Sequence, residues 1–190
     1  MPCCQGTLRY TKFYRMQFSN HHISIASFED VSDITILLNS AYRGEASKKG
    51  WTTEEHLIGG DTRSTDQLTA DTMKEEKSVF LKYTEDGEII GCVNLQEHGE
   101  KIYLGMFSVA PGRQGSGIGK EILKAAEEYS LSVNCGIIYM SVISVRTELT
   151  DWYKRHGYAD TGIRKPFVED NITGKHKMPL EFLFLEKNIR

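Results

Sequence analysis

The sequence lacks several features that would place it in a specialised class. Its 190 residues contain only four cysteines and four prolines, and no two cysteines form a CxxC pair. A zinc site or a disulfide framework therefore has no support, and no metal is expected. No apolar run approaches the ~20 residues that a membrane-spanning helix needs. The first twenty residues also lack a signal-peptide-like apolar stretch, so we expect a cytoplasmic protein without a membrane partner.

The charge balance excludes a further class. The net charge is −3 and there is no long basic block, whereas a surface that follows nucleic-acid phosphates carries a basic excess. Hydrophobic residues make up 39% and charged residues 26% of the chain, which is ordinary for a globular protein. We expect one domain over 21–190, after a tail over 1–20 whose pattern does not decide its order. Cys92 and Cys135 lie in apolar runs and are interpreted as small core residues.

Periodicity and turn residues predict an α/β fold with a mixed sheet. An Asp-Gly pair at Asp86–Gly87 indicates a hairpin. Two capping-box patterns, Thr52 with Glu55 and Ser64 with Gln67, predict helix starts. Strands are expected over 22–28, 78–84, 88–97, 101–110, 136–144, 158–163 and 179–189. Helices are expected over 29–43, 52–58, 64–76, 119–132 and 146–157.

A glycine-rich stretch, "VAPGRQGSGIGKEIL" (109–123), separates a predicted strand from a predicted helix. The first N–H groups of a helix have no intrahelical partner, and the helix dipole favours an anion there. Glycine allows positive φ and removes the side chain that would block a diphosphate. The residues from Gln114 to Lys120 are therefore a candidate phosphate cradle, although many glycine-rich turns bind nothing.

Two nucleotide motifs fail on this stretch. A P-loop needs GxxxxGK followed by Ser or Thr, but Gln114 takes the first glycine position and Glu121 follows Lys120. The dinucleotide fingerprint needs GxGxxG, but the third glycine comes one residue early, and the next predicted strand carries no acid.

The stretch does resemble the acetyl-CoA motif of the GNAT superfamily of N-acetyltransferases, Q/R-x-x-G-x-G/A, at every position from Gln114 to Gly119. The flanking "MFSVAP" and "GKEILKAAEEY" and the later "WYKRHGY" resemble the family's strand, helix and tyrosine segment. The order of elements agrees over about 22–188. The resemblance implies one domain with a mostly antiparallel sheet of about seven strands, helices on both faces and a splay at the cofactor slot.

The resemblance also implies roles for named residues. The backbone from Phe107 to Val109 would pair with the pantetheine arm of acetyl-CoA, with a bulge at Met106 or Phe107 driving the splay. Tyr153 would be the general acid that protonates the departing thiolate, although an aromatic at a helix–sheet contact would look the same. The implied cofactor contacts are Phe107, Ser108, Val109, Gln114, Gly115, Ser116, Gly117, Ile118, Gly119 and Lys120.

Three positions depart from the family pattern. Tyr103 and Ser141 stand where many relatives carry a glutamate base, and neither can act as a carboxylate. Arg146 stands where many relatives have asparagine, and it could contact CoA or the next helix. Glu97 and His98 are fallback bases. A non-catalytic acyl-CoA-binding module with the same fold therefore stays open as an alternative to acetyl transfer to a primary amine.

The acceptor amine, small molecule or protein, is expected under the segment 42–76. Its acids could attract a cationic amine or simply form a solvated helix face. Arg43 and Arg63 would instead suit an acceptor that also carries a carboxylate. The last predicted strand could close the sheet or pair across a homodimer.

Overall fold

The computed structural model describes residues 16–169 and 174–190, so most of the predicted tail lies outside the described residues. Of that tail, Ser19 donates its N–H to Glu128 (2.9 Å) and Asn20 donates its side-chain amide to Glu121 (3.1 Å). Both acids lie on α5 (Ile118–Ser132), so this part of the chain runs along that helix.

Seven strands form the main sheet, in the order β1-β3-β4-β5-β6-β9-β7. All neighbours are antiparallel except β5 and β6. The strands are β1 (Ile23–Ile25), β3 (Ser78–Glu85), β4 (Glu88–His98), β5 (Lys101–Val109), β6 (Ile137–Ile143), β7 (Ala159–Pro166) and β9 (Glu181–Asn188). A two-stranded sheet pairs β2 (Ile58–Gly59) with β8 (Lys175–His176). Because β9 lies between β6 and β7, the last strand closes the sheet within the chain.

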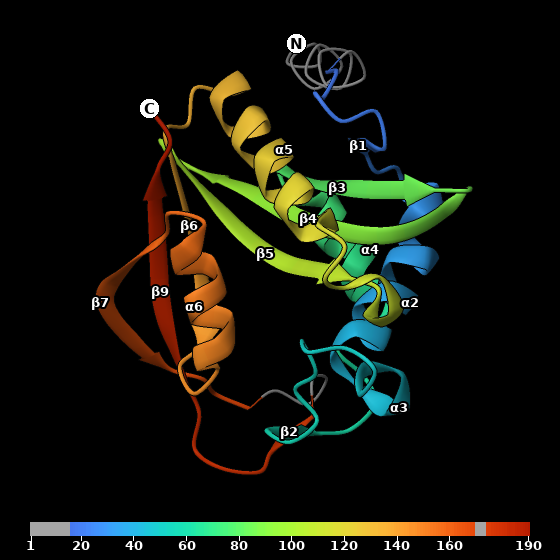
Figure 1. Ribbon diagram of the computed structural model, residues 1–190, viewed down its shortest axis with the longest axis vertical. Coiled ribbons are helices and arrows are strands. Elements are labelled where there is room, and N and C mark those ends of the chain that lie inside the picture. Colours follow the sequence, from blue (N-terminus) through green and yellow to red (C-terminus); the bar gives the residue numbers. More distant parts are fainter. Residues whose placement is uncertain (1–15, 170–173) are drawn as a thin grey trace, which may run out of the picture.

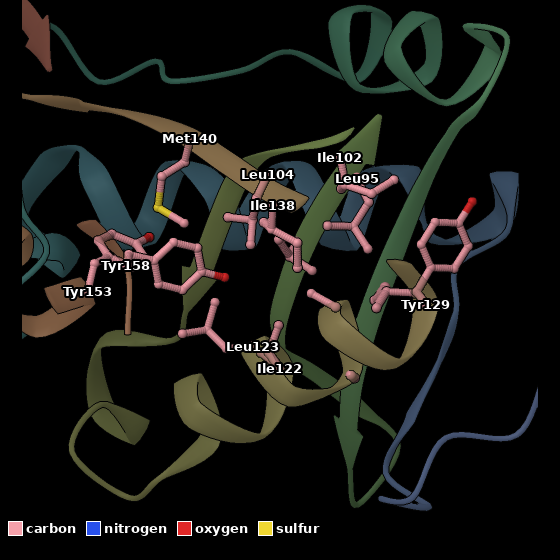
Figure 2. Packing of buried hydrophobic residues seen from close by; sticks show 14 of the residues in the cluster. Leu95, Ile102, Leu104, Ile122, Leu123, Tyr129, Ile138, Met140, Tyr153 and Tyr158 are labelled. Atoms are coloured by element: carbon pink, nitrogen blue, oxygen red, sulfur yellow. The ribbon is translucent and has the colours of Figure 1, made fainter. Parts of the chain in front are cut away.

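Helices cover both faces of the sheet (Figure 1). On one face, α5 and α6 (Thr147–Arg155) pack with Ile122, Leu123 and Tyr153 on the largest core cluster, whose side chains Figure 2 shows. On the other face, α2 (Val31–Tyr42) and α4 (Asp66–Lys74) cover β3 and β4. The predicted sheet with helices on both faces is confirmed. No helix among the described residues is long and apolar enough to cross a membrane.

Local sequence patterns predicted the structure well where the interacting residues are close in sequence. Asp86 (φ 51°) and Gly87 (φ 84°) both adopt the positive φ of a tight hairpin turn. The helix predicted from Ser64 exists, but its cap is Thr65, whose side chain accepts from the Leu68 N–H (3.2 Å). Cys92 and Cys135 are buried core residues, as predicted.

The helix predicted over 52–58 is wrong. The Thr52 hydroxyl does not cap a helix, because it donates to the Ala41 carbonyl (3.1 Å) and accepts from the Gln114 side chain (2.7 Å). Only a turn at Glu54 and the short strand β2 form there. A four-residue helix, α3 (Gly44–Ser47), lies instead where a loop was expected.

The splay predicted between two strands is present. Strands β5 and β6 are in register only from Lys101 opposite Ile137 to Tyr103 opposite Tyr139, and beyond that point they diverge (Figure 1). The pairing of β5 with β4 shifts between Cys92 and Asn94, and Met106, on the bulged side, has a φ of 46°. A bulge bends its strand, so its position on β5 agrees with the splay that the family resemblance implied.

Candidate active site

The glycine-rich loop lies exposed at the start of α5. Gly115 and Gly117 have φ values of 82° and 91°, and a Cβ at either position would meet no atom within 4 Å. The first backbone bond of the helix runs from the Glu121 N–H to the Gly117 carbonyl (3.2 Å). The N–H groups of Ile118, Gly119 and Lys120 come before that bond, so they are available to an anion.

The other predicted residues of the loop fit the same use. The Lys120 side chain is exposed, whereas the Ile118 side chain is buried in the core and leaves only its backbone at the surface. Ser116 donates its hydroxyl to the Arg113 carbonyl (2.6 Å), which tightens the turn. The loop thus fits a diphosphate through its backbone, with one cation beside it.

The Gln114 side chain has a role that the sequence motif did not predict. Its Nε2 donates to Thr52 Oγ1 (2.7 Å) and to the Val109 carbonyl (3.0 Å), while its Oε1 accepts from the Trp51 N–H (2.8 Å). A Cβ at Gly50 would lie 2.6 Å from that Oε1, so glycine is needed for this close approach. Gln114 therefore ties the segment 50–54 to the glycine-rich loop.

Arg146 holds the same segment from the opposite side. Its guanidinium donates to the carbonyls of Trp51 and Thr52 (both 3.2 Å) and pairs with Glu148 at the start of α6. The Arg146 residue is only 1% exposed. Of the two partners left open for this arginine, the next helix is one, and the segment 50–54 is a further partner that the sequence did not predict; a contact with CoA stays a prediction.

A cavity of about 130 Å³ lies between the diverging ends of β5 and β6. It is lined from both sheet faces and from the segments after α2 and β7. Among its lining residues are Tyr42, Arg43, Glu54, Arg63, Arg146 and Tyr153. Phe167 and Phe182 close the side near β9.

Tyr153 reaches this cavity from α6. It is 5% exposed, and burial raises its pKa well above the ordinary value, so the hydroxyl stays protonated at neutral pH. Its ring lies 6.4 Å from that of Phe107 and 5.7 Å from that of Tyr158. Figure 2 shows Tyr153 and Tyr158 side by side near Met140. The position of Tyr153 is compatible with a general-acid role and equally with a packing contact, so the acid role stays a prediction.

The free edge of β5 faces the gap. Ala110 donates its N–H to the Ile90 carbonyl on β4 (2.8 Å), and alternate residues of a strand point their backbone groups to opposite sides. The groups of Phe107 and Val109 therefore face the gap, whereas those of Ser108 face β4. The Phe107 carbonyl accepts from the Tyr42 hydroxyl and the Val109 carbonyl from Gln114. The pairing of β5 with a cofactor arm stays a prediction. Because both carbonyls already accept hydrogen bonds, the groups left for such an arm are the N–H groups of Phe107 and Val109.

Two charged residues of the segment 42–76 that line the cavity form an ion pair with each other. Arg43 and Glu54 form a buried ion pair (2.6 Å), in which the side chains are 1% and 12% exposed. Tyr42 lies beside them, and burial raises its pKa to about 12. The Arg63 guanidinium lies 5.7 Å from the Tyr42 ring centre and lines the cavity.

The positions of the missing glutamates also line the cavity. The hydroxyls of Tyr103 and Ser141 lie 2.9 Å apart in a hydrogen bond. The fallback bases do not reach the site: Glu97 accepts from Tyr129 (3.4 Å), and His98 bonds the Tyr139 hydroxyl (2.5 Å), both outside the cavity lining. No carboxylate base therefore stands at the family positions.

Comparison with known families decides the affiliation. The family model described as the acetyltransferase (GNAT) family matches residues 33–158, well over half of the chain. The chain belongs to the GNAT acetyltransferase family. The resemblance inferred from the motif is thereby confirmed.

Individual GNAT relatives are distant. Streptothricin acetyltransferase of Streptomyces lavendulae is 23% identical over 106 residues, which span 54% of this chain and 56% of that relative. The ribosomal-protein-S18-alanine N-acetyltransferase of Escherichia coli superposes with a TM-score of 0.64 at 12% identity, covering 88% of this chain and 92% of that one. An N-acetyltransferase of Staphylococcus aureus Mu50 gives a TM-score of 0.67 at 14% identity, with 90% and 100% covered. At such identities the solved structures show the fold alone.

Proposed function

We propose that this protein transfers an acetyl group from acetyl-CoA to a primary amine. The GNAT family generally uses acetyl-CoA. One observation carries the proposal: the open amide loop at the start of α5 is bonded through Gln114 to Val109 of β5, the strand whose Phe107 lines the cavity together with the buried Tyr153. One strand at the splay of the sheet thus connects a candidate anion site to a protonated acid.

The cofactor side would bind through backbone groups. The N–H groups of Ile118, Gly119 and Lys120 suit a diphosphate, and those of Phe107 and Val109 suit an extended arm that adds to the edge of β5. Acetyl-CoA, when bound, supplies an acetyl group already activated as a thioester. The GNAT chain itself has to orient that arm and keep water out, and the partly buried ring of Phe107 with the buried ring of Tyr153 would serve that purpose.

Tyr153 would hold the proton that the departing sulfur needs. Its burial and raised pKa keep the proton on the hydroxyl oxygen across the neutral range. No carboxylate base is needed for an amine that arrives already neutral, and Tyr103 and Ser141 offer only hydroxyls. The relatives' names point to different acceptors, streptothricin in one and an alanine of ribosomal protein S18 in another, so they do not choose an acceptor for this chain.

A thiol-release assay tests the proposal. Purified protein, acetyl-CoA and a panel of amines should give free thiol and an acetylated amine detectable by mass spectrometry. Tyr153→Phe should lower kcat by about 100-fold or more, the usual worth of acid catalysis, without weakening coenzyme A binding. Tyr158→Phe is the matched control, because the Tyr158 hydroxyl is buried without a described partner and does not line the cavity.

The competing function is a non-catalytic module that binds acyl-CoA, favoured by the absence of carboxylates at Tyr103 and Ser141. Binding of coenzyme A without turnover on any amine of the panel would support that function and overturn acetyl transfer.

A further inference from the structure

Among the described residues on the acceptor side of the cavity, one cation has no anionic partner. Arg63 lines the cavity, its residue is half-buried, and its guanidinium makes no ion pair with any residue in 16–169 or 174–190. It rests instead near the face of Tyr42, 5.7 Å from the ring centre. Its backbone N–H is fixed by the Asn39 side chain (2.6 Å), so the residue is held in place without a charge to neutralise it.

The acid that lines the cavity is already neutralised. Among the described lining residues the one acid is Glu54, which pairs with Arg43 at 2.6 Å. Glu55 pairs with Lys48 at 3.3 Å and does not line the cavity. The ammonium of an acceptor would therefore meet no free carboxylate among the described lining residues, whereas an anionic group would meet Arg63.

The balance of charge in the lining points the same way. Of the three arginines in the cavity wall, Arg43 pairs with Glu54 and Arg146 with Glu148, so Arg63 is the arginine of the wall without an ion pair among the described residues. A guanidinium is planar and always charged, and it binds carboxylates through two parallel hydrogen bonds. A partly desolvated one gains more from such a ligand than an exposed one.

From this we infer that the acceptor is a small amine that also carries a carboxylate, which Arg63 binds as the specificity-determining residue. The inference rests on the proposed acetyl transfer and names its substrate class. The sequence left two acceptor types open, a cationic amine drawn by acids and an amine with a carboxylate. The ion pairing of Arg43 with Glu54 leaves no unpaired acid among the described lining residues, which disfavours the first type, and it leaves Arg63 for the second.

The experiment compares amines in matched pairs. Each α- and ω-amino acid of a panel is assayed by thiol release beside its primary amide, which keeps the amine and removes the carboxylate. Wild-type protein should prefer the acid of the best pair about tenfold or more in kcat/KM, the worth of one charge-assisted hydrogen bond. Arg63→Gln should raise KM for the acid until the preference disappears and should leave the amide unchanged. Arg63→Lys should keep part of the preference.

The control is Arg164→Gln on the exposed strand β7, where the arginine pairs with Asp160 (2.7 Å) outside the cavity lining; it should leave the preference intact. Amides used as well as acids by wild type, or a preference that survives Arg63→Gln, would overturn the inference while acetyl transfer stands. Coenzyme A binding with no thiol release from any amine would overturn both.

Discussion

The two sides of the cavity are built in different ways. On the cofactor side, one continuous stretch from Gln114 to Lys120 offers backbone N–H groups, and small side chains leave them exposed. On the acceptor side, charged side chains converge from separate segments, with Arg43 after α2 and Glu54 eleven positions further on. A ligand shared by a family can be bound by backbone, whereas an acceptor particular to one member calls for side chains.

The first test removes the buried ion pair on the acceptor side of the cavity. Replacing one member of a buried ion pair leaves the other without its charge partner, so Arg43→Met should lower the free energy of unfolding by about 3–5 kcal/mol. Urea unfolding measures the loss. The double variant Arg43→Met/Glu54→Leu should recover most of it.

The matched control is the exposed pair of Lys74 with Asp71, whose side chains are 60% and 54% exposed. Lys74→Met should leave the unfolding curve unchanged, because exposed pairs contribute little. If Arg43→Met proves as mild as this control, the acceptor side is not held by its ion pair.

The second test alters only the glycine-rich loop on the cofactor side. Gly117 has a φ of 91°, which a β-branched residue adopts poorly. Gly117→Val should weaken coenzyme A binding by about tenfold or more, because it distorts the amides and covers them, yet cost only about 1–2 kcal/mol of stability. The only two tryptophans, Trp51 and Trp152, lie 6.3 Å apart near this loop, so their fluorescence reports binding.

Gly112→Ala is its control, since Gly112 lies on the same turn without positive φ and with nothing within 4 Å of an added Cβ. Equal binding by Gly117→Val and Gly112→Ala would show that the loop does not hold the cofactor.

The third test asks whether the two sides are independent. Gln114 joins the cofactor loop to Trp51 and Thr52, two residues before Glu54. Gln114→Ala removes three hydrogen bonds, about 1–3 kcal/mol in all, and should raise KM severalfold for both acetyl-CoA and the amine. Gln114→Glu should not restore it, because a carboxylate cannot donate to the Val109 carbonyl. A change in the KM of acetyl-CoA alone would mean that the sides act separately.

The smallest effect concerns pH. Burial raises the pKa of Tyr42 to about 12 and that of Tyr153 well above its usual value, while tyrosine in the unfolded chain titrates near pH 10. Both hydroxyls therefore stay protonated from pH 7 to about 10, and kcat should show no alkaline fall in that range. Above about pH 10 the unfolded chain ionises first, so the free energy of unfolding should decrease. An alkaline fall of kcat near pH 8 would contradict the acid role of Tyr153.

The open turn and helix start of the proposed cofactor side could be predicted from sequence because their parts are contiguous. The motif from Gln114 to Gly119 contains the turn, the open amides and the helix start in six residues. The bulge at Met106 also lies next to recognisable strand residues, and the splay follows from it.

The acceptor side could not be predicted in the same way. Thr52 and Glu55 match a capping box, but the hydroxyl of Thr52 is taken by Ala41 and Gln114, which only the tertiary fold brings near. No local sequence pattern indicates that Glu54 pairs with Arg43 and not with Arg63. The glycine at position 50 is the sequence feature that permits the contact with the Gln114 side chain. Its importance can be recognised only in the structure, because the two residues are far apart in the sequence.

Amide NMR of the loop tests the central claim most directly. When coenzyme A is titrated into the wild-type protein, the N–H signals of Gly115, Gly117 and Gly119 should shift together and saturate at one equivalent. Signals that stay in place at saturating coenzyme A would show that these amides do not bind the diphosphate, and would contradict the proposed cofactor site.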